Sequence, residues 1–302
     1  MSKDDSIIRP LDRKLVNTGM EINDFLHDRP DFLHAIMCQL GLPRSRQESR
    51  TFKRSVGSAS MLLQAGHRAD AKGGWTELPL PYGSKPRLAL IHISSEAVRT
   101  QSPHIDVSDG IVPFLKNAGI SINGQGFKLF KDQMTYLSAC EMNLAWTHGD
   151  RLDQMKCAPV QSFSAWADPF TAQSAFWPDE LTLGHEFFET LCAHAVPLDP
   201  RAIYALKGSA LALDIYSWMA YRLCKIRKDS GQKLFWKNLR DQFGQEYACP
   251  KNFKKAFSSA LRQVLTVYPD AKVRTEQGGI RFYPSPPPIR KKRVVVKLPN
   301  GS

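Results

Sequence analysis

Cationic and short polar side chains recur along one side of the segment 250–268. The apolar residues of this segment are spaced i, i+3 and i+4, which predicts an amphipathic helix that begins at Pro250. The rows opposite the apolar residues contain no Asp or Glu before Asp270 and hold Lys251, Asn252, Lys254, Lys255, Ser258, Ser259 and Arg262. Long cations neutralise phosphates and short polar groups reach base edges, so this helix face predicts binding in the major groove of DNA.

The excess positive charge of the chain is concentrated in its last quarter. The net charge is +12, from 41 Lys and Arg against 29 Asp and Glu. Residues 222–302 hold 19 Lys and Arg against 5 Asp and Glu, a net charge of +14, so residues 1–221 have a net charge of −2. This asymmetry predicts a polyanionic partner, with nucleic acid favoured over an anionic membrane surface. For the cations of 250–268 alone, an ordinary solvated helix face is the alternative.

A predicted β-hairpin follows this helix. Residues 271–275 and 280–283 flank the turn Glu276-Gln277-Gly278-Gly279, whose glycines allow positive φ. The hairpin adds three cations to the candidate DNA-binding residues, namely Lys272, Arg274 and Arg281. Two predicted helices, 209–226 and 236–243, come before the cationic one, so the order is helix, helix, helix, hairpin, which is typical of a winged-helix domain.

The first half of the chain shows the same order of predicted elements. These elements are a helix from Pro86, helices at 109–117 and 127–137, and strands at 141–147 and 153–165 around a turn at 148–150. We therefore expect an α+β protein with tandem winged-helix domains, that is, helix bundles that each carry a β-hairpin wing. The first half offers fewer cations, Lys128, Lys131 and Arg151, which suit a dimer surface as well as a DNA contact.

The remaining signals suggest how the chain is divided. They predict an apolar helix at 32–40, a hairpin at 50–56 and 59–64, a strand with its connection at 171–183, and a helix at 184–193. The expected parts are a polar N-terminal extension (1–30), a first winged-helix-like domain (31–170), a second, basic winged-helix domain that binds DNA (171–285), and a basic tail (286–302).

Motifs for catalysis and metal binding are missing from the sequence. The six cysteines are too far apart for a zinc finger, and neither a His-x-His pair nor a phosphate-binding loop occurs. The segment His185–Glu189 has Glu where a zinc-protease motif needs its second His. We therefore predict no enzyme, no cofactor and no metal site. No apolar run could cross a membrane and the acidic start lacks an export signal, so a cytoplasmic protein is expected.

Aromatic residues of the second half allow two interpretations. Trp218, Phe235, Trp236, Phe253 and Phe257 are the residues concerned. They could form a platform on which bases stack. Their helical spacing favours a place in the hydrophobic core instead.

Four stretches of the sequence resemble those of RepA-type plasmid replication initiators. They are Cys38-Gln-Leu-Gly-Leu-Pro-Arg-Ser45, Leu78-Pro-Leu-Pro-Tyr-Gly-Ser-Lys-Pro-Arg-Leu-Ala-Leu90, Val196-Pro-Leu-Asp-Pro-Arg-Ala202 and Leu206-Lys-Gly-Ser-Ala-Leu-Ala-Leu-Asp-Ile-Tyr-Ser-Trp218. The last stretch is the most specific because it is long and its order is unusual. The resemblance extends from Cys38 to Tyr283 and leaves out the first 30 residues and the basic tail.

The resemblance implies a non-enzymatic initiator of theta-type plasmid replication. Similar proteins bind repeated sites in double-stranded DNA at the origin, help to open the duplex, and assist loading of host replication proteins such as the helicase. Many also form homodimers that repress their own gene. No catalytic residues of the family carry over to this chain, and tandem winged helices are the architecture of related initiators.

Two other functions are alternatives to an initiator. A winged-helix transcriptional regulator unrelated to replication, with a ligand or dimer domain in front, fits the same elements. An enzyme acting on nucleic acid, such as a primase or nuclease, would need a metal-binding carboxylate cluster. The spacing of Asp109, Asp132, Asp150 and Asp153 does not indicate one.

Overall fold

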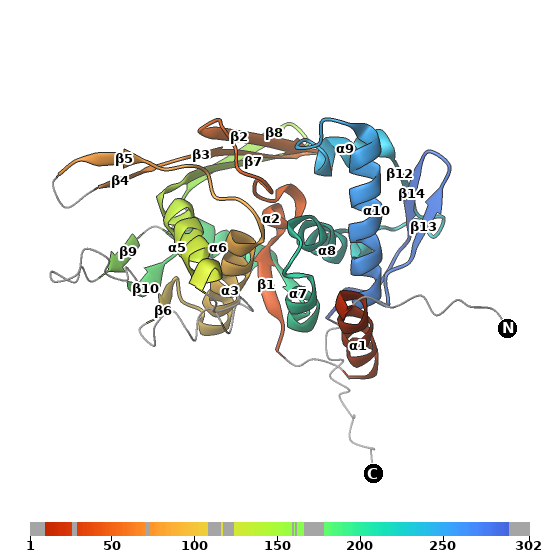
Figure 1. Cartoon of the computed structure of the whole chain (residues 1–302). Helices are drawn as coiled ribbons and strands as arrows, with labels where there is room; N and C mark the ends of the chain where they lie inside the picture. Colours follow the sequence, from red (N-terminus) through yellow and green to blue (C-terminus); the bar gives the residue numbers. More distant parts are fainter. Residues whose placement is uncertain are drawn as a thin grey trace, which may run out of the picture.

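The computed structural model describes residues 10–25, 29–69, 73–107, 116, 124–158, 160, 162–165 and 178–289. Within these residues the protein is an α+β structure, in which helices and small sheets share a continuous hydrophobic core (Figure 1). The predicted helix at 109–117 lies outside the described residues, apart from residue 116, and so do residues 1–9 and the basic tail from 290 onward.

The helices begin and end largely where capping signals predict. Ser209 accepts a hydrogen bond from the Ala212 amide and caps the helix after it, and Pro250 occupies the first turn of another. The helices are α1 Pro10–Asp24, α2 Ala35–Leu40, α3 Ser84–Thr100, α5 Gly124–Ala139, α6 His185–His194, α7 Pro200–Leu206, α8 Ala210–Arg222, the 3-10 turn η1 Leu223–Lys225, α9 Trp236–Phe243 and α10 Pro250–Val267.

The strands are short and fall into separate sheets. They are β1 Asp31–His34, β2 Thr51–Val56, β3 Ala59–Gln64, β4 His67–Ala69, β5 Trp75–Glu77, β6 His104–Asp106, β7 Glu141–His148, β8 Arg151–Cys157, β9 Ser162–Ala165, β10 Pro178–Thr182, β11 Ala195–Leu198, β12 Gln232–Phe235, β13 Val273–Glu276 and β14 Gly279–Phe282. Within the described residues the sheet orders are β2-β3-β7-β8, β12-β14-β13, β6-β10-β9, β1-β11 and β4-β5.

The predicted carboxyl-terminal helices and hairpin are confirmed. The structure has α8, α9 and α10 followed by β13 and β14, and Gly278 in the turn between these strands has a φ of +80°. The sequence missed β12, which lies between α8 and α9 and pairs with β14 so that Phe235 faces Gly279. The four residues of β12 carry no alternating pattern, and their partner strand is more than 40 residues away in the chain.

Two strand assignments in the first half correct the sequence analysis. Residues 32–34, predicted as the start of the helix 32–40, belong instead to β1, which pairs with β11, so the helix begins only at Ala35. The predicted strand 153–165 is two strands, because β8 ends at Cys157 and β9 pairs with β10. Both hairpins of this half are confirmed, and β3 pairs with β7 to join them.

Helix α1 lies in the segment 1–30, which the sequence analysis predicts to be a polar extension. It packs against α10. Leu15 of α1 is buried in the core. A Cβ at Gly19 would overlap the carbonyl oxygen of Thr266, so glycine is what allows the two helices to approach so closely. The division of the chain into domains stays a prediction, and the pairing of β1 with β11 links residues on the two sides of its proposed boundary at 170.

A buried histidine at the end of β1 makes stability depend on pH. The Ile36 amide donates to Nδ1 of His34, so the proton is on Nε2, which donates to Thr190 Oγ1 at 3.1 Å. The ring also stacks on Phe187. Burial, together with the charge of His194, lowers the pKa of His34 to about 4.

We expect acid to destabilise the protein through this group. The unfolded state binds the proton near pH 6.5 but the folded state only near pH 4, so stability is complete above pH 6.5 and is lost as the pH falls toward 4. The loss amounts to about 3 kcal/mol at pH 4. Urea unfolding at neutral and acid pH measures it. His34→Asn keeps a capping acceptor and should reduce this pH dependence; an identical pH profile would contradict the assignment.

Candidate nucleic-acid interface

Helix α10 presents one buried and one exposed side, as its sequence predicts. Phe253, Phe257 and Val264 are fully buried and pack toward the core with α8 and α9. The opposite side, which we call the α10 face, consists of Lys251, Asn252, Lys254, Lys255, Ser258, Ser259 and Arg262. The two serines are half-buried and the other five residues are exposed. The structure therefore brings all seven predicted residues of this helix onto one accessible surface.

The cations of the α10 face are not neutralised by neighbouring acids. Within the described part of the chain, no carboxylate lies within ion-pair distance of its three lysines or of Arg262. Lys254 is exposed, and its ammonium lies 5.1 Å from the centre of the Trp236 ring. Helix α1 packs at the carboxyl-terminal end of α10, where Gly19 meets Thr266 (Figure 1). The surface is thus positively charged and open.

The three hairpin cations have different environments. Lys272 and Arg274 are exposed. Arg281 instead donates from Nε and Nη2 to the two oxygens of Glu276, at 2.7 and 3.2 Å, and from Nη1 to the Ser230 carbonyl. All three nitrogens of its guanidinium are engaged, so Arg281 fixes the shape of the hairpin. The sequence analysis grouped Arg281 with the DNA-binding candidates because a sequence shows which residues are charged but not which of them form ion pairs.

The aromatic residues divide between the two interpretations. Trp218, Phe253 and Phe257 are buried, as the core interpretation predicts. Trp236 is half-buried and packs edge-on against Phe257. Phe235 is different, because 55% of it is exposed. The sequence pattern did not distinguish the buried aromatic residues from the exposed Phe235; their burial is decided by the contacts made on folding.

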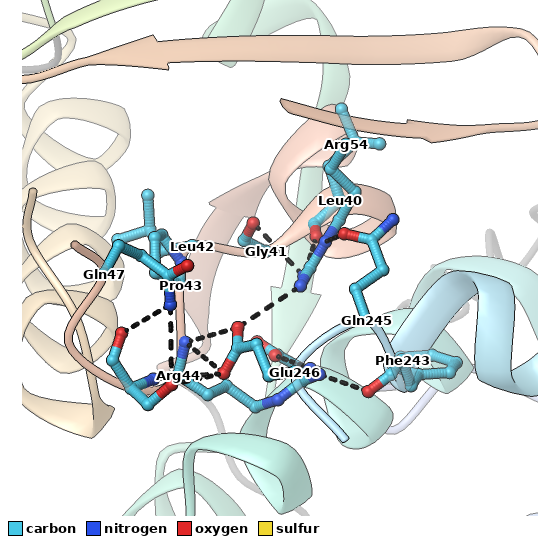
Figure 2. A network of polar contacts seen from close by, with 12 residues as sticks. Leu40, Gly41, Leu42, Pro43, Arg44, Gln47, Arg54, Phe243, Gln245 and Glu246 are labelled. Atoms are coloured by element: carbon cyan, nitrogen blue, oxygen red, sulfur yellow. Dashed lines mark hydrogen bonds and ion pairs between the residues drawn. The ribbon is translucent and has the colours of Figure 1, made fainter. Parts of the chain in front are cut away.

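The loop that leads into α10 is attached to the first half of the chain by Glu246. Its carboxylate accepts hydrogen bonds from the amides of Arg44 and Ser45, at 2.9 and 3.1 Å, and lies 3.7 Å from Nη2 of Arg54 (Figure 2). Arg54 also donates to Gln245, next to Glu246. Burial and the charge of Arg44 lower the pKa of Arg54 to about 10. The amino-terminal end of α10 is therefore held in place by residues more than 190 positions away.

A second carboxylate, Asp214 on α8, completes this polar cluster. Arg87 binds it with Nε at 2.6 Å and Nη2 at 2.9 Å, and Arg44 with Nη1 at 3.1 Å. Burial opposes the charge of Asp214, but Arg87, Arg44 and Arg54 outweigh that effect and lower its pKa.

Arg44, Arg87 and Asp214 come from three of the four stretches that resemble RepA-type initiators, at 38–45, 78–90 and 206–218. The sequence analysis quoted these stretches without linking them. The structure shows that they meet in one buried cluster, which joins α3 and the loop after α2 to α8. Arg44, Arg87 and Asp214, which lie in the stretches that resemble RepA-type initiators, therefore have a structural role.

The candidate cations of the first half form a weaker pattern. Arg151 is paired with Asp153 at 2.8 Å, and Lys128 on α5 is exposed. In the described part of the chain, no three His, Cys, Asp or Glu side chains gather as they would around a metal ion. None of the helices described here is both long and apolar enough to cross a membrane.

Comparison with known proteins identifies the family. The family model described as plasmid encoded RepA protein matches residues 80–238, more than half of the chain. The chain belongs to this RepA family. The matched residues include α3, α5 and α8, and with them Arg87 and Asp214 of the polar cluster. Membership supports a role in the initiation of plasmid replication.

Solved structures show the same fold at low sequence identity. Two crystal structures of RctB that contain its domains 2 and 3 match this RepA-family chain with TM-scores of 0.52 and identities of 13% and 12%. Each alignment covers 82% of this chain and 96% of the RctB chain. A search of curated protein sequences gave no match.

Proposed function

We propose that this RepA-family protein binds repeated sites in double-stranded DNA at a plasmid origin, and that the α10 face makes the main contacts. The observation that carries the proposal is the row of exposed cations on α10, which no carboxylate of the described residues approaches within ion-pair distance. Such a row neutralises phosphates, while Asn252, Ser258 and Ser259 lie where short polar groups reach base edges. Membership of the RepA family supports the same role.

The arrangement around α10 supports a winged-helix unit. Along the chain the order is α8, β12, α9, α10, β13, β14, and the three strands form one sheet with β14 in the centre. In this proposal α10 is the recognition helix and the β13–β14 hairpin is the wing. Lys272 and Arg274 then contact the adjacent DNA backbone, and Arg281 keeps the wing rigid through Glu276. A matching unit in the first half, around α5 and the β7–β8 hairpin, is part of the same proposal.

The proposal extends to the partners that the family resemblance implies. These are host replication proteins such as the helicase or the host initiator, and a second copy of the chain in a homodimer that represses its own gene. The protein acts without catalysis in this scheme, by binding the origin and recruiting the host proteins that open and copy it.

We expect the double substitution Lys254→Ala and Arg262→Ala to weaken DNA binding at least tenfold at roughly 150 mM salt. Both side chains are exposed, so the variant should unfold at the same urea concentration as the wild type. The probe is the duplex beside the protein's own gene, and gel shifts measure the affinity. A matched control, Lys14→Ala and Lys207→Ala, removes the same charge from lysines that lie over the Tyr204 ring and should bind nearly normally.

Unchanged affinity of the Lys254/Arg262 variant would show that the α10 face is not the DNA-binding surface. Footprinting of the same DNA tests the biological role. Protection of tandem repeats supports an initiator, whereas protection of a single palindrome supports the alternative of a transcriptional regulator. Nicking of supercoiled DNA in the presence of magnesium would contradict the non-enzymatic scheme.

A further inference from the structure

Phe235 is an exposed aromatic residue at the turn of the β13–β14 hairpin. It is the last residue of β12 and pairs with Gly279, and a Cβ at Gly278 would lie 3.9 Å from its ring. The amide of the next residue, Trp236, donates to the Gly278 carbonyl at 3.1 Å. The backbone that carries the phenyl ring is therefore tied to the hairpin turn on one side and to the start of α9 on the other.

The exposure of Phe235 contrasts with the other phenylalanines of this part of the chain. Phe243, Phe253, Phe257 and Phe282 are at most 2% exposed, whereas Phe235 is 55% exposed. Leaving much of a phenyl ring in water forgoes hydrophobic stabilisation that burial would provide. The ring does not fill a place in the core, so its surface is available to a partner.

Cations lie around this ring. Lys233, two residues earlier on the same strand, has its ammonium 5.2 Å from the centre of the Phe235 ring, and Lys237 is exposed on the first turn of α9. Lys254 of the α10 face lies over Trp236. The nearby acid Glu276 is paired with Arg281 and lies 3.7 Å from Lys233, so its charge is compensated. Lys233 also donates to the Gln277 carbonyl at 2.9 Å, so it is engaged within the hairpin. The exposed Lys237 and Lys254 are the lysines that continue the α10 face toward this ring.

An exposed aromatic ring among lysines has the chemistry of a nucleobase contact. Lysines hold the sugar–phosphate backbone, and the aromatic face stacks on a base that has been drawn out of the helical stack. An anionic protein partner would also satisfy the lysines, but the continuity with the α10 face favours the nucleic acid that this face is proposed to bind. The rigid attachment of Phe235 to the hairpin turn keeps the ring directed outward when the complex forms.

We propose that Phe235 is a nucleobase-contacting residue, which inserts against a base step of the bound duplex and partly unstacks it. This inference rests on the proposed function of the α10 face. It adds the unstacking of a base step to that function, since a protein that contacts only the major groove would leave the bases stacked. The unstacked step lies beside the hairpin turn, at one edge of the bound site.

The test uses the full chain and the duplex beside its own gene, with a mixed-sequence duplex at low salt as the second probe. Permanganate oxidises thymines that are unstacked, so its reactivity reports the deformation separately from the affinity. Wild-type protein should make thymines at one edge of the bound site reactive. Phe235→Ala should abolish that reactivity and bind about tenfold more weakly. Phe235→Trp keeps a ring and should retain both signals.

Phe25 supplies the matched control, because it is 66% exposed and lies just after α1. Phe25→Ala should leave affinity and permanganate reactivity unchanged. Urea unfolding of Phe235→Ala should match the wild type, and retention of both signals by Phe235→Trp separates the loss of the ring from misfolding. Normal thymine reactivity with Phe235→Ala overturns this inference alone. If the Lys254/Arg262 variant also binds normally, the proposed function fails with it.

Discussion

Replacing Asp214 by Ala should lower the free energy of unfolding by about 3–5 kcal/mol. Arg87 and Arg44 both use this carboxylate, and the side chains of the three residues are less than 10% exposed. Removing the acid leaves two arginines, with Arg54 close by, in a buried site without the charge that compensates them. Water cannot replace that compensation unless the core opens, so the cost is far above that of a surface ion pair.

Urea denaturation at neutral pH measures this effect. Asp229→Ala is the matched control, because Asp229 is an exposed aspartate in the turn that follows η1. Its loss should change the stability by less than about 0.5 kcal/mol. A loss below about 1 kcal/mol for Asp214→Ala would show that the arginines find other partners, and that the cluster does not hold α8 against α3.

The second large effect is on DNA binding. If the six free cations of α10 and the hairpin each meet a phosphate, the logarithm of the affinity falls with that of the salt concentration with a slope of roughly −5. The affinity then drops about a thousandfold between 50 and 200 mM salt. The six residues are Lys251, Lys254, Lys255, Arg262, Lys272 and Arg274, and Arg281 is left out because its guanidinium is bound to Glu276 and Ser230.

Fluorescence anisotropy of a labelled duplex at a series of salt concentrations gives this slope directly. The Lys254/Arg262 double variant should reduce its magnitude by about 2, one for each lost phosphate contact. The Lys14/Lys207 control should keep the wild-type slope. A slope near zero for the wild type would exclude phosphate neutralisation by this surface, whatever the affinity at a single salt concentration.

Much of the carboxyl-terminal unit could be predicted from the sequence. The apolar spacing of α10, the capping Ser209 and the glycines of the β13–β14 turn are local signals, which act within a few residues. A helix with one apolar side has one way to face the core, so the exposure of Lys251 and Lys255 followed from the same pattern.

Contacts between distant parts of the chain could not be predicted in this way. Asp31–His34 carries an apolar run that suits a helix, yet it is a strand because β11 offers it hydrogen-bonding partners. The same holds for Arg281, whose charge is plain in the sequence but whose partner Glu276 is found only once the hairpin has formed. Strand pairing depends on which other segment lies next to the strand, and local sequence patterns do not contain that information.

The sequence by itself determined which residues of this RepA-family chain carry positive charge and which side of α10 they occupy, because helical periodicity and composition are local properties. Only the tertiary structure decided that Arg44, Arg87 and Asp214 meet in one buried cluster and that Glu246 attaches the start of α10 to the first half. It also decided that Phe235 stays outside the core while Phe257 enters it. These outcomes depend on burial and on charge pairing across long stretches of chain, and both arise only when the elements pack.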